Sequence, residues 1–151
     1  MRFQGKIVLI VGGNSGIGLS SAQQFAQEGA TVIVTGRAQK TLDEAVASIP
    51  GARGFQTDIA DTEALTPVVE AISREFGRLD ILFVNAGVGA FAPVRDVTPQ
   101  LWDEIHNINL RGCFFAVQKA LPLLGRGSGI VLRNSILAEA ESPLNSSYSA
   151  S

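Results

Sequence analysis

The chain has 151 residues, of which 46% are hydrophobic and 17% are charged, and its formal net charge is −2. A nearly neutral chain with scattered lysines and arginines has no electrostatic footprint for nucleic acid or for an anionic membrane. Its one cysteine cannot form an internal disulfide and its one histidine cannot build a metal cluster with it, so we expect no metal site.

The N-terminal region carries no recognisable targeting or membrane-spanning segment. Only five apolar residues follow Lys6, which is too short a run for a signal-peptide core or a membrane span. No repeat, low-complexity tract or Pro/Gly linker divides the sequence. We therefore expect a single globular domain over residues 1–151, located in the cytoplasm, with no membrane or nucleic-acid partner.

Apolar runs of strand length alternate with helical periodicity along the chain. In chain order, the spacing predicts a strand over 6–11, a helix over 16–29, a strand over 31–35, a helix over 40–48, a strand over 53–57, a helix over 62–76, a strand over 79–84, a helix over 100–124 and a fifth strand over 129–134. Continuous apolar strands between amphipathic helices are typical of a parallel sheet covered on both faces. The pattern predicts a doubly wound, Rossmann-type α/β fold.

The first strand leads directly into a glycine-rich turn over residues 12–18. The first amides of a helix that begins in such a turn have no internal partners, so they can hold a phosphate. Gly12 would let the strand turn, Gly16 would let the backbone approach a pyrophosphate, and Gly18 would let the helix pack on the sheet. The G-x-x-x-G-x-G spacing differs from the common dinucleotide fingerprint, so a tight turn without a ligand stays an alternative for this segment alone.

Polar or glycine residues follow every predicted strand at its carboxyl end, which is where ligands bind in this fold class. Beyond the glycine turn they are Gly36-Arg37, Asp58, Asn85-Ala86-Gly87 and Asn134-Ser135. Because these strand ends meet at one edge of the sheet, the pattern favours a nucleotide site over a turn that has no ligand.

These motifs together resemble the short-chain dehydrogenase/reductase family over the whole chain. The family's turn T-G-x-x-x-G-I-G corresponds to residues 11–18, with Val11 in place of threonine; its Asn-Ala-Gly motif corresponds to 85–87 and its Tyr-x-x-x-Lys motif begins at Tyr148. The resemblance implies hydride transfer between a nicotinamide cofactor and a small alcohol or carbonyl substrate. It also implies a homo-oligomer.

The same resemblance implies three catalytic residues. Ser135 would hydrogen-bond the substrate carbonyl, Tyr148 would exchange the proton as general acid or base, and Asn109 would hold a water in the proton relay. The alternatives are a helix cap or turn residue for Ser135, an ordinary loop tyrosine for Tyr148 and a solvent-facing asparagine for Asn109.

Residues expected to bind the cofactor come from the turn and the strand ends: Gly12, Asn14, Ser15, Gly16, Ile17, Gly18, Arg37, Asp58, Ile59, Asn85, Ala86, Gly87 and Tyr148. Asp58 and Ile59 would meet the adenine ring, although Asp58 could be a helix cap, and Asn85 would tie neighbouring strands together. The second strand ends in Thr35-Gly36-Arg37, which offers an arginine and no acid. A basic residue there pairs with the 2′-phosphate of NADP, so we expect NADP rather than NAD, with a solvated surface charge as the alternative for Arg37.

The sequence stops at Ser151, one position before the lysine of the Tyr-x-x-x-Lys motif. We therefore expect the C-terminal part of the family fold to be missing, Tyr148 to be a poor base, and the 151-residue form alone to be inactive. The strand over 129–134 would be an open apolar edge that promotes association. Two alternatives remain: an inactive nucleotide-binding fragment that serves as a sensor or interaction module, and a different α/β nucleotide binder with coincidental motifs.

Overall fold

The computed structural model describes residues 1–139 and 143–151 and contains one five-stranded parallel sheet. Its strands are β1 (Ile7–Val11), β2 (Thr31–Gly36), β3 (Arg53–Gln56), β4 (Leu79–Val84) and β5 (Leu124–Leu132). They lie in the order β3-β2-β1-β4-β5. The chain therefore adds β2 and β3 on one side of β1 and then crosses over to add β4 and β5 on the other side. The predicted doubly wound α/β fold with five strands is confirmed.

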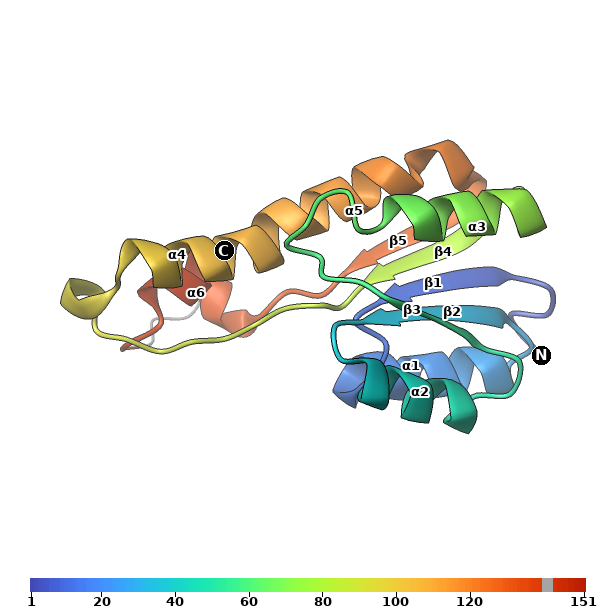
Figure 1. Cartoon of the computed structure of the whole chain (residues 1–151), viewed down its shortest axis with the longest axis horizontal. Coiled ribbons are helices and arrows are strands. Elements are labelled where there is room, and N and C mark those ends of the chain that lie inside the picture. Colours follow the sequence, from blue (N-terminus) through green and yellow to red (C-terminus); the bar gives the residue numbers. More distant parts are fainter. Residues whose placement is uncertain (140–142) are drawn as a thin grey trace.

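Helices cover both faces of this sheet, with α1 and α2 on one side and α3 and α5 on the other (Figure 1). The α-helices are α1 (Gly16–Gln27), α2 (Gln39–Ser48), α3 (Thr66–Phe76), α4 (Pro99–His106), α5 (Cys113–Ala120) and α6 (Ser146–Ser149). Short segments η1 (Val94–Asp96), η2 (Asn107–Gly112), η3 (Leu121–Leu123) and η4 (Ile136–Ala138) connect them. In the described part of the chain, no helix is long and apolar enough to cross a membrane.

The central strand β1 is buried on both faces, which explains its unbroken apolar sequence. Leu9 packs in one core cluster with Ile72 of α3. The next residue, Ile10, points to the opposite face and packs in a second cluster with Leu42 of α2. Because successive side chains of a strand alternate between faces, a strand covered on both sides needs apolar residues at every position.

The fifth strand differs from the predicted range 129–134: it begins at Leu124 and ends at Leu132. The register against β4 shifts between Leu79 and Ile81, where β5 carries extra residues. There the Ser128 hydroxyl donates to the Leu79 carbonyl and accepts from the Gly125 amide. This glycine-rich stretch has low intrinsic strand propensity, so only its long-range contacts reveal the pairing.

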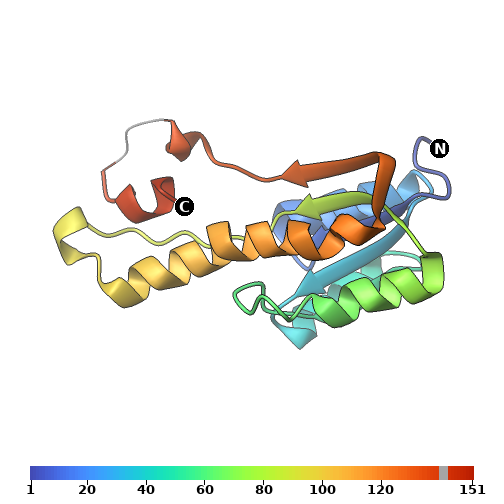
Figure 2. The same cartoon turned by 90° about the horizontal axis from the view of Figure 1, so that it is seen from above.

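The long helix predicted over 100–124 is one continuous helical path that changes type along its length (Figure 2). The middle segment η2 is π-helical, and the last turn η3 is a 3₁₀ turn that contains Pro122. Helix α3 begins at Thr66 rather than at residue 62. The Asp61 carboxylate accepts from the Glu63 amide there, which makes a turn instead of the first helical residues.

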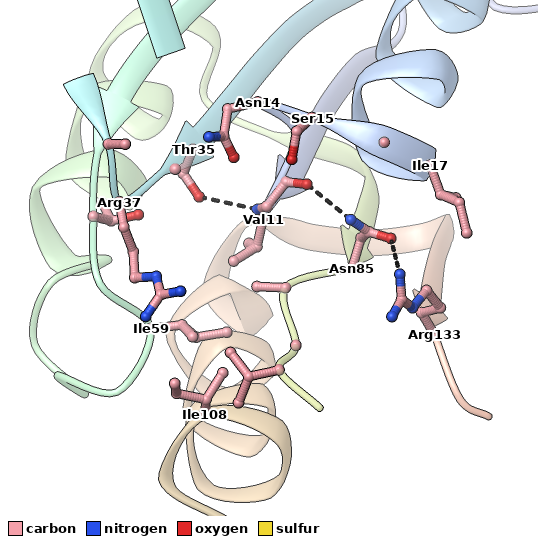
Figure 3. Close-up of a pocket in the computed structure, with 18 residues that line it drawn as sticks. Val11, Asn14, Ser15, Ile17, Thr35, Arg37, Ile59, Asn85, Ile108 and Arg133 are labelled. Carbon is pink, nitrogen blue, oxygen red and sulfur yellow. Dashed lines mark hydrogen bonds between the residues drawn. The ribbon is translucent and has the colours of Figure 1, made fainter. Parts of the chain in front are cut away.

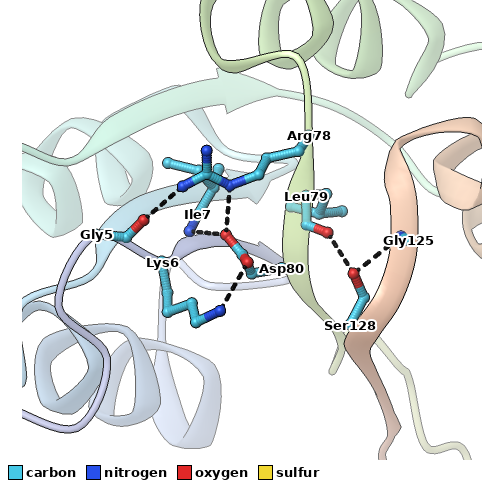
Figure 4. A network of polar contacts seen from close by, with 8 residues as sticks. All are labelled: Gly5, Lys6, Ile7, Arg78, Leu79, Asp80, Gly125 and Ser128. Carbon is cyan, nitrogen blue, oxygen red and sulfur yellow. Dashed lines mark hydrogen bonds and ion pairs between the residues drawn. The ribbon is translucent and has the colours of Figure 1, made fainter.

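A polar network joins β1 and β4 at the amino ends of the strands (Figure 4). One carboxylate oxygen of Asp80 accepts from Lys6 Nζ at 3.0 Å, and the other accepts from the Ile7 amide at 2.9 Å and from Arg78 Nε at 3.2 Å. The network therefore lies at the end of these two strands opposite to their carboxyl ends.

Candidate functional site

A pocket of about 320 Å³ lies at the carboxyl ends of the strands (Figure 3). Of the residues expected to bind a cofactor, the following line it: Gly12, Asn14, Ser15, Gly16, Ile17, Arg37, Ile59, Asn85, Ala86 and Gly87. Side chains from β1, β2, β4 and the segment after β3 therefore converge as the strand-end pattern predicts.

The pocket wall also contains residues outside the set expected to bind the cofactor: Val11, Thr35, Gly36, Ala38, Thr57, Val88, Ile108 and Arg133. Most of these are direct neighbours of motif residues. Arg133 differs, because it follows β5 immediately and is a charged residue at the end of an apolar run. The same strand-end rule that selects Asn134 and Ser135 could have found it.

The glycine turn between β1 and α1 has the geometry that its sequence suggests. Gly12 adopts φ +81°, and a Cβ placed on it would lie 2.7 Å from the Ala86 backbone. A Cβ on Gly18 would lie 2.1 Å from the Gly12 carbonyl oxygen, so this glycine lets α1 approach the turn closely. Gly16 adopts φ +53° and faces open space within 4 Å.

Two neighbouring strands anchor this turn. The Gly12 and Gly13 amides both donate to the Thr35 carbonyl, at 3.1 and 2.9 Å. On the other side, Asn85 Nδ2 donates to the Gly12 carbonyl at 2.8 Å, and the Asn85 amide donates to the Val11 carbonyl. Asn85 therefore ties β4 to β1.

The first turn of α1 faces the pocket without a side-chain cap. Ser15 occupies the N-cap position, but its hydroxyl makes no capping hydrogen bond. The amides of Gly16 and Ile17 consequently lie at a pocket wall as donors that the α-helix itself does not use.

Asp58 and Gly18 lie beside the pocket and do not line it. The Asp58 carboxylate accepts from the Ala60 amide at 3.0 Å, which is an Asx turn rather than a helix cap. Its neighbour Ile59 does reach the pocket, and the contact of Asp58 with an adenine ring stays a prediction.

A second, smaller cavity of about 50 Å³ adjoins the first. Its lining brings together the three residues expected to be catalytic, namely Asn109, Ser135 and Tyr148, with Arg133 and Ser151. Ala86, Gly87 and Arg133 line both cavities, so they form the boundary between them.

Ser135 and Asn109 are held by specific hydrogen bonds. Ser135 Oγ accepts from the Leu137 amide at 3.2 Å and caps η4, which leaves the hydroxyl proton free to donate elsewhere. Asn109 Oδ1 accepts from the Val88 amide, while Nδ2 donates to the Val88 carbonyl and to Ser151 Oγ. Both amide protons of Asn109 are thus engaged, so its side chain could hold a water only through Oδ1.

Comparison with known proteins gives a consistent result. A family model described as short chain dehydrogenase matches residues 6–151. Among curated relatives, oxidoreductase asL5 of Sarocladium schorii is 38% identical over 153 residues, which is 99% of this chain and 61% of that protein. The NADP-dependent (R)-specific alcohol dehydrogenase of Lentilactobacillus kefiri is 32% identical over 99% of this chain and 62% of its own length. The chain therefore spans about three fifths of these relatives.

Solved structures agree with this result. A short chain dehydrogenase from Burkholderia cenocepacia, determined in complex with NADP, superposes with a TM-score of 0.94 at 35% identity over 99% of this chain and 64% of that one. A short-chain dehydrogenase/reductase from Serratia marcescens superposes with a TM-score of 0.95 at 28% identity, with the same coverage.

Proposed function

Because the chain belongs to the short-chain dehydrogenase/reductase family, we propose that it forms one domain, over residues 1–151, that binds the cofactor of an oxidoreductase. The reaction is hydride transfer between NADP(H) and a small alcohol or carbonyl compound. The pocket at the strand ends carries the proposal, because an uncapped helix start and Arg37 line the same cavity.

The residues of this pocket fit a dinucleotide. The exposed amides at the start of α1 suit a diphosphate, since the positive end of the helix dipole lies there. The open space beside Gly16 lets a phosphate approach the backbone. When bound, the nicotinamide ring supplies or accepts the hydride. We assign binding to Gly12, Asn14, Ser15, Gly16, Ile17, Gly18, Arg37, Asp58, Ile59, Asn85, Ala86, Gly87 and Tyr148.

The charge of the pocket supports NADP over NAD. Arg37 follows β2, and no acidic residue is among the described residues that line the pocket. A carboxylate at this strand end accepts from ribose hydroxyls, whereas an arginine pairs with a 2′-phosphate through a bidentate fork.

The second cavity supports the assignment of catalytic roles. Ser135 keeps a hydroxyl proton to donate to a carbonyl oxygen, which stabilises charge that develops there. Tyr148 lines the same cavity and exchanges the proton with that oxygen. Asn109 positions the loop after β4 through Val88, and its Oδ1 has a remaining lone pair for a relay water.

Exposed apolar surface supports self-association. Leu110, Phe114 and Leu121 are exposed along the η2 to η3 path, and Ile130, Val131 and Leu132 are exposed on β5. Clusters of exposed apolar residues are typical of an interface. We propose a homo-oligomer that covers it.

Titration of the 151-residue chain with NADPH and NADH tests the cofactor assignment, read by cofactor fluorescence and by the rise in melting temperature. We expect NADPH to bind on the order of tenfold tighter than NADH, because one charge-assisted contact is added. The Arg37→Gln variant should lose this preference. The control is Arg95→Gln, which removes an exposed arginine of η1 outside both cavities.

No fluorescence change and no thermal protection with either cofactor at millimolar concentration would refute the assignment. Binding without NADPH oxidation across a panel of carbonyl compounds would make the 151-residue chain a nucleotide-binding module rather than an enzyme.

A further inference from the structure

The first pocket has a simple charge pattern. Among the described residues that line it, only Arg37 and Arg133 carry a charge, and both are positive. Figure 3 shows them on different sides of the pocket, with Arg37 beside Ile59 and Arg133 beside Asn85 and Ile17. Such a pocket favours a ligand with two separate anionic groups.

The guanidinium of Arg133 uses few of its N–H donors within the described part of the chain. Its Nη1 donates to Asn85 Oδ1 at 3.4 Å, which is a long contact, while a guanidinium has five N–H donors. Within the described part of the chain, Arg133 makes no ion pair with an acidic residue.

The position of Arg133 is set by the sheet. Its amide donates to the Val84 carbonyl at 3.0 Å, which continues the pairing of β5 with β4 beyond Leu132. The side chain lines both cavities and therefore stands at their boundary. The uncapped start of α1, at Ser15 to Ile17, lines the first of these cavities as well.

We propose that Arg133 is a second anion-binding residue of the pocket and that it pairs with the diphosphate of the nicotinamide cofactor. This inference rests on the proposed function. The α1 amides and the Arg133 fork then hold the diphosphate from two sides, while Arg37 holds the 2′-phosphate. The two arginines thus recognise different parts of one ligand.

The test separates these parts with three ligands: NADP⁺, NAD⁺ and adenosine 2′-monophosphate, which has a 2′-phosphate and no diphosphate. Dissociation constants are measured by calorimetry for the 151-residue chain and for Arg133→Gln, Arg133→Lys and Arg37→Gln. Arg126→Gln is the matched control, because Arg126 lies on β5, the strand that Arg133 directly follows, and lines neither cavity. The melting temperature without ligand shows that each variant is folded.

We expect Arg133→Gln to weaken the binding of NADP⁺ and NAD⁺ on the order of tenfold and to leave the binding of adenosine 2′-monophosphate unchanged. The affinity of Arg133→Lys for NADP⁺ and NAD⁺ should lie between those of wild type and Arg133→Gln, since lysine keeps the charge and loses the bidentate contact of the guanidinium. Arg37→Gln should weaken only the binding of the two ligands that have a 2′-phosphate, NADP⁺ and adenosine 2′-monophosphate. Added salt should reduce the difference between wild type and Arg133→Gln.

Equal binding of NADP⁺ by wild type and Arg133→Gln would overturn the inference, as would an equal loss of adenosine 2′-monophosphate binding. An equal loss in Arg126→Gln would also overturn it, because the effect would then be one of overall charge. If the wild-type chain binds none of the three ligands, the proposed function itself fails.

Discussion

Asp80 illustrates how a single residue can join two strands. Its side chain is only 14% exposed, and it accepts hydrogen bonds from Lys6, Arg78 and the Ile7 amide. Burial by itself would raise the pKa of the Asp80 carboxyl, but these hydrogen bonds and the charge of Lys6 outweigh it and hold the pKa below its ordinary value. The ionised form therefore stabilises the folded chain.

We expect Asp80→Asn to lower the free energy of unfolding at pH 7 by about 1–2 kcal/mol, because it removes the charged acceptor of these hydrogen bonds. The loss stays this small because the side chains of Lys6 and Arg78 are about half exposed, so solvent screens their charges. Urea unfolding from pH 7 to pH 2 measures this difference. A folded-state pKa that is lowered gives stability above the unfolded pKa and loses it as the pH falls through the folded pKa. The advantage of wild type should therefore disappear in acid.

The control for this variant is Asp103→Asn, which removes an exposed carboxylate from α4. A loss of stability equal to that of Asp80→Asn, or a difference that does not change with pH, would contradict the role given to Asp80.

The junction of β1 and α1 is the element on which the pocket depends. Alanine normally stabilises a helix relative to glycine by about 1 kcal/mol. At Gly18 the added Cβ would meet the Gly12 carbonyl at 2.1 Å and Asn85 Nδ2 at 2.7 Å, and these groups belong to the turn itself. The clash therefore outweighs helix propensity.

We expect Gly18→Ala to destabilise the fold by about 2–3 kcal/mol and to weaken NADPH binding, because the turn must move. Chemical unfolding and NADPH titration measure the two effects. Gly125→Ala is the control, since a Cβ there meets nothing within 4 Å. If Gly18→Ala proved as stable as this control, the result would show that α1 tolerates a larger separation from the turn.

At the scale of the whole molecule, the sheet has an apolar outer edge. Strand β5 pairs with β4 on one side and is the last strand of the described sheet. Ile130, Val131 and Leu132 on this strand are 43%, 50% and 53% exposed. An edge strand with apolar side chains and unpaired backbone groups promotes association between copies.

We expect the 151-residue chain to associate with rising concentration, and Val131→Lys to shift it toward the monomer, since an edge lysine opposes pairing. Sedimentation equilibrium over a range of concentrations measures this shift. Val94→Lys is the control, because Val94 is 77% exposed on η1, away from the sheet. A monomer at all concentrations, or the same shift in both variants, would contradict the proposal.

Local patterns were sufficient for most of the fold and much of the pocket. Strands buried on both faces have continuous apolar sequences, and the residues directly after them meet at one edge, so Gly12, Arg37 and Asn85 could be predicted to converge. Prediction failed where local and long-range preferences conflict. The start of β5 depends on the contact of Ser128 with Leu79, which no periodicity reveals.

By itself, the sequence determined the parallel α/β class, the edge of the sheet at which the pocket lies and the glycine turn, because each is recorded in residues that are neighbours along the chain. Only the tertiary structure decided the strand order, the place of Arg133 between two cavities and the partners of Asn109. Val88 and Ser151 lie 21 and 42 positions from Asn109, on either side of it. Such contacts depend on how whole elements pack, and packing geometry leaves no periodic signal in the sequence.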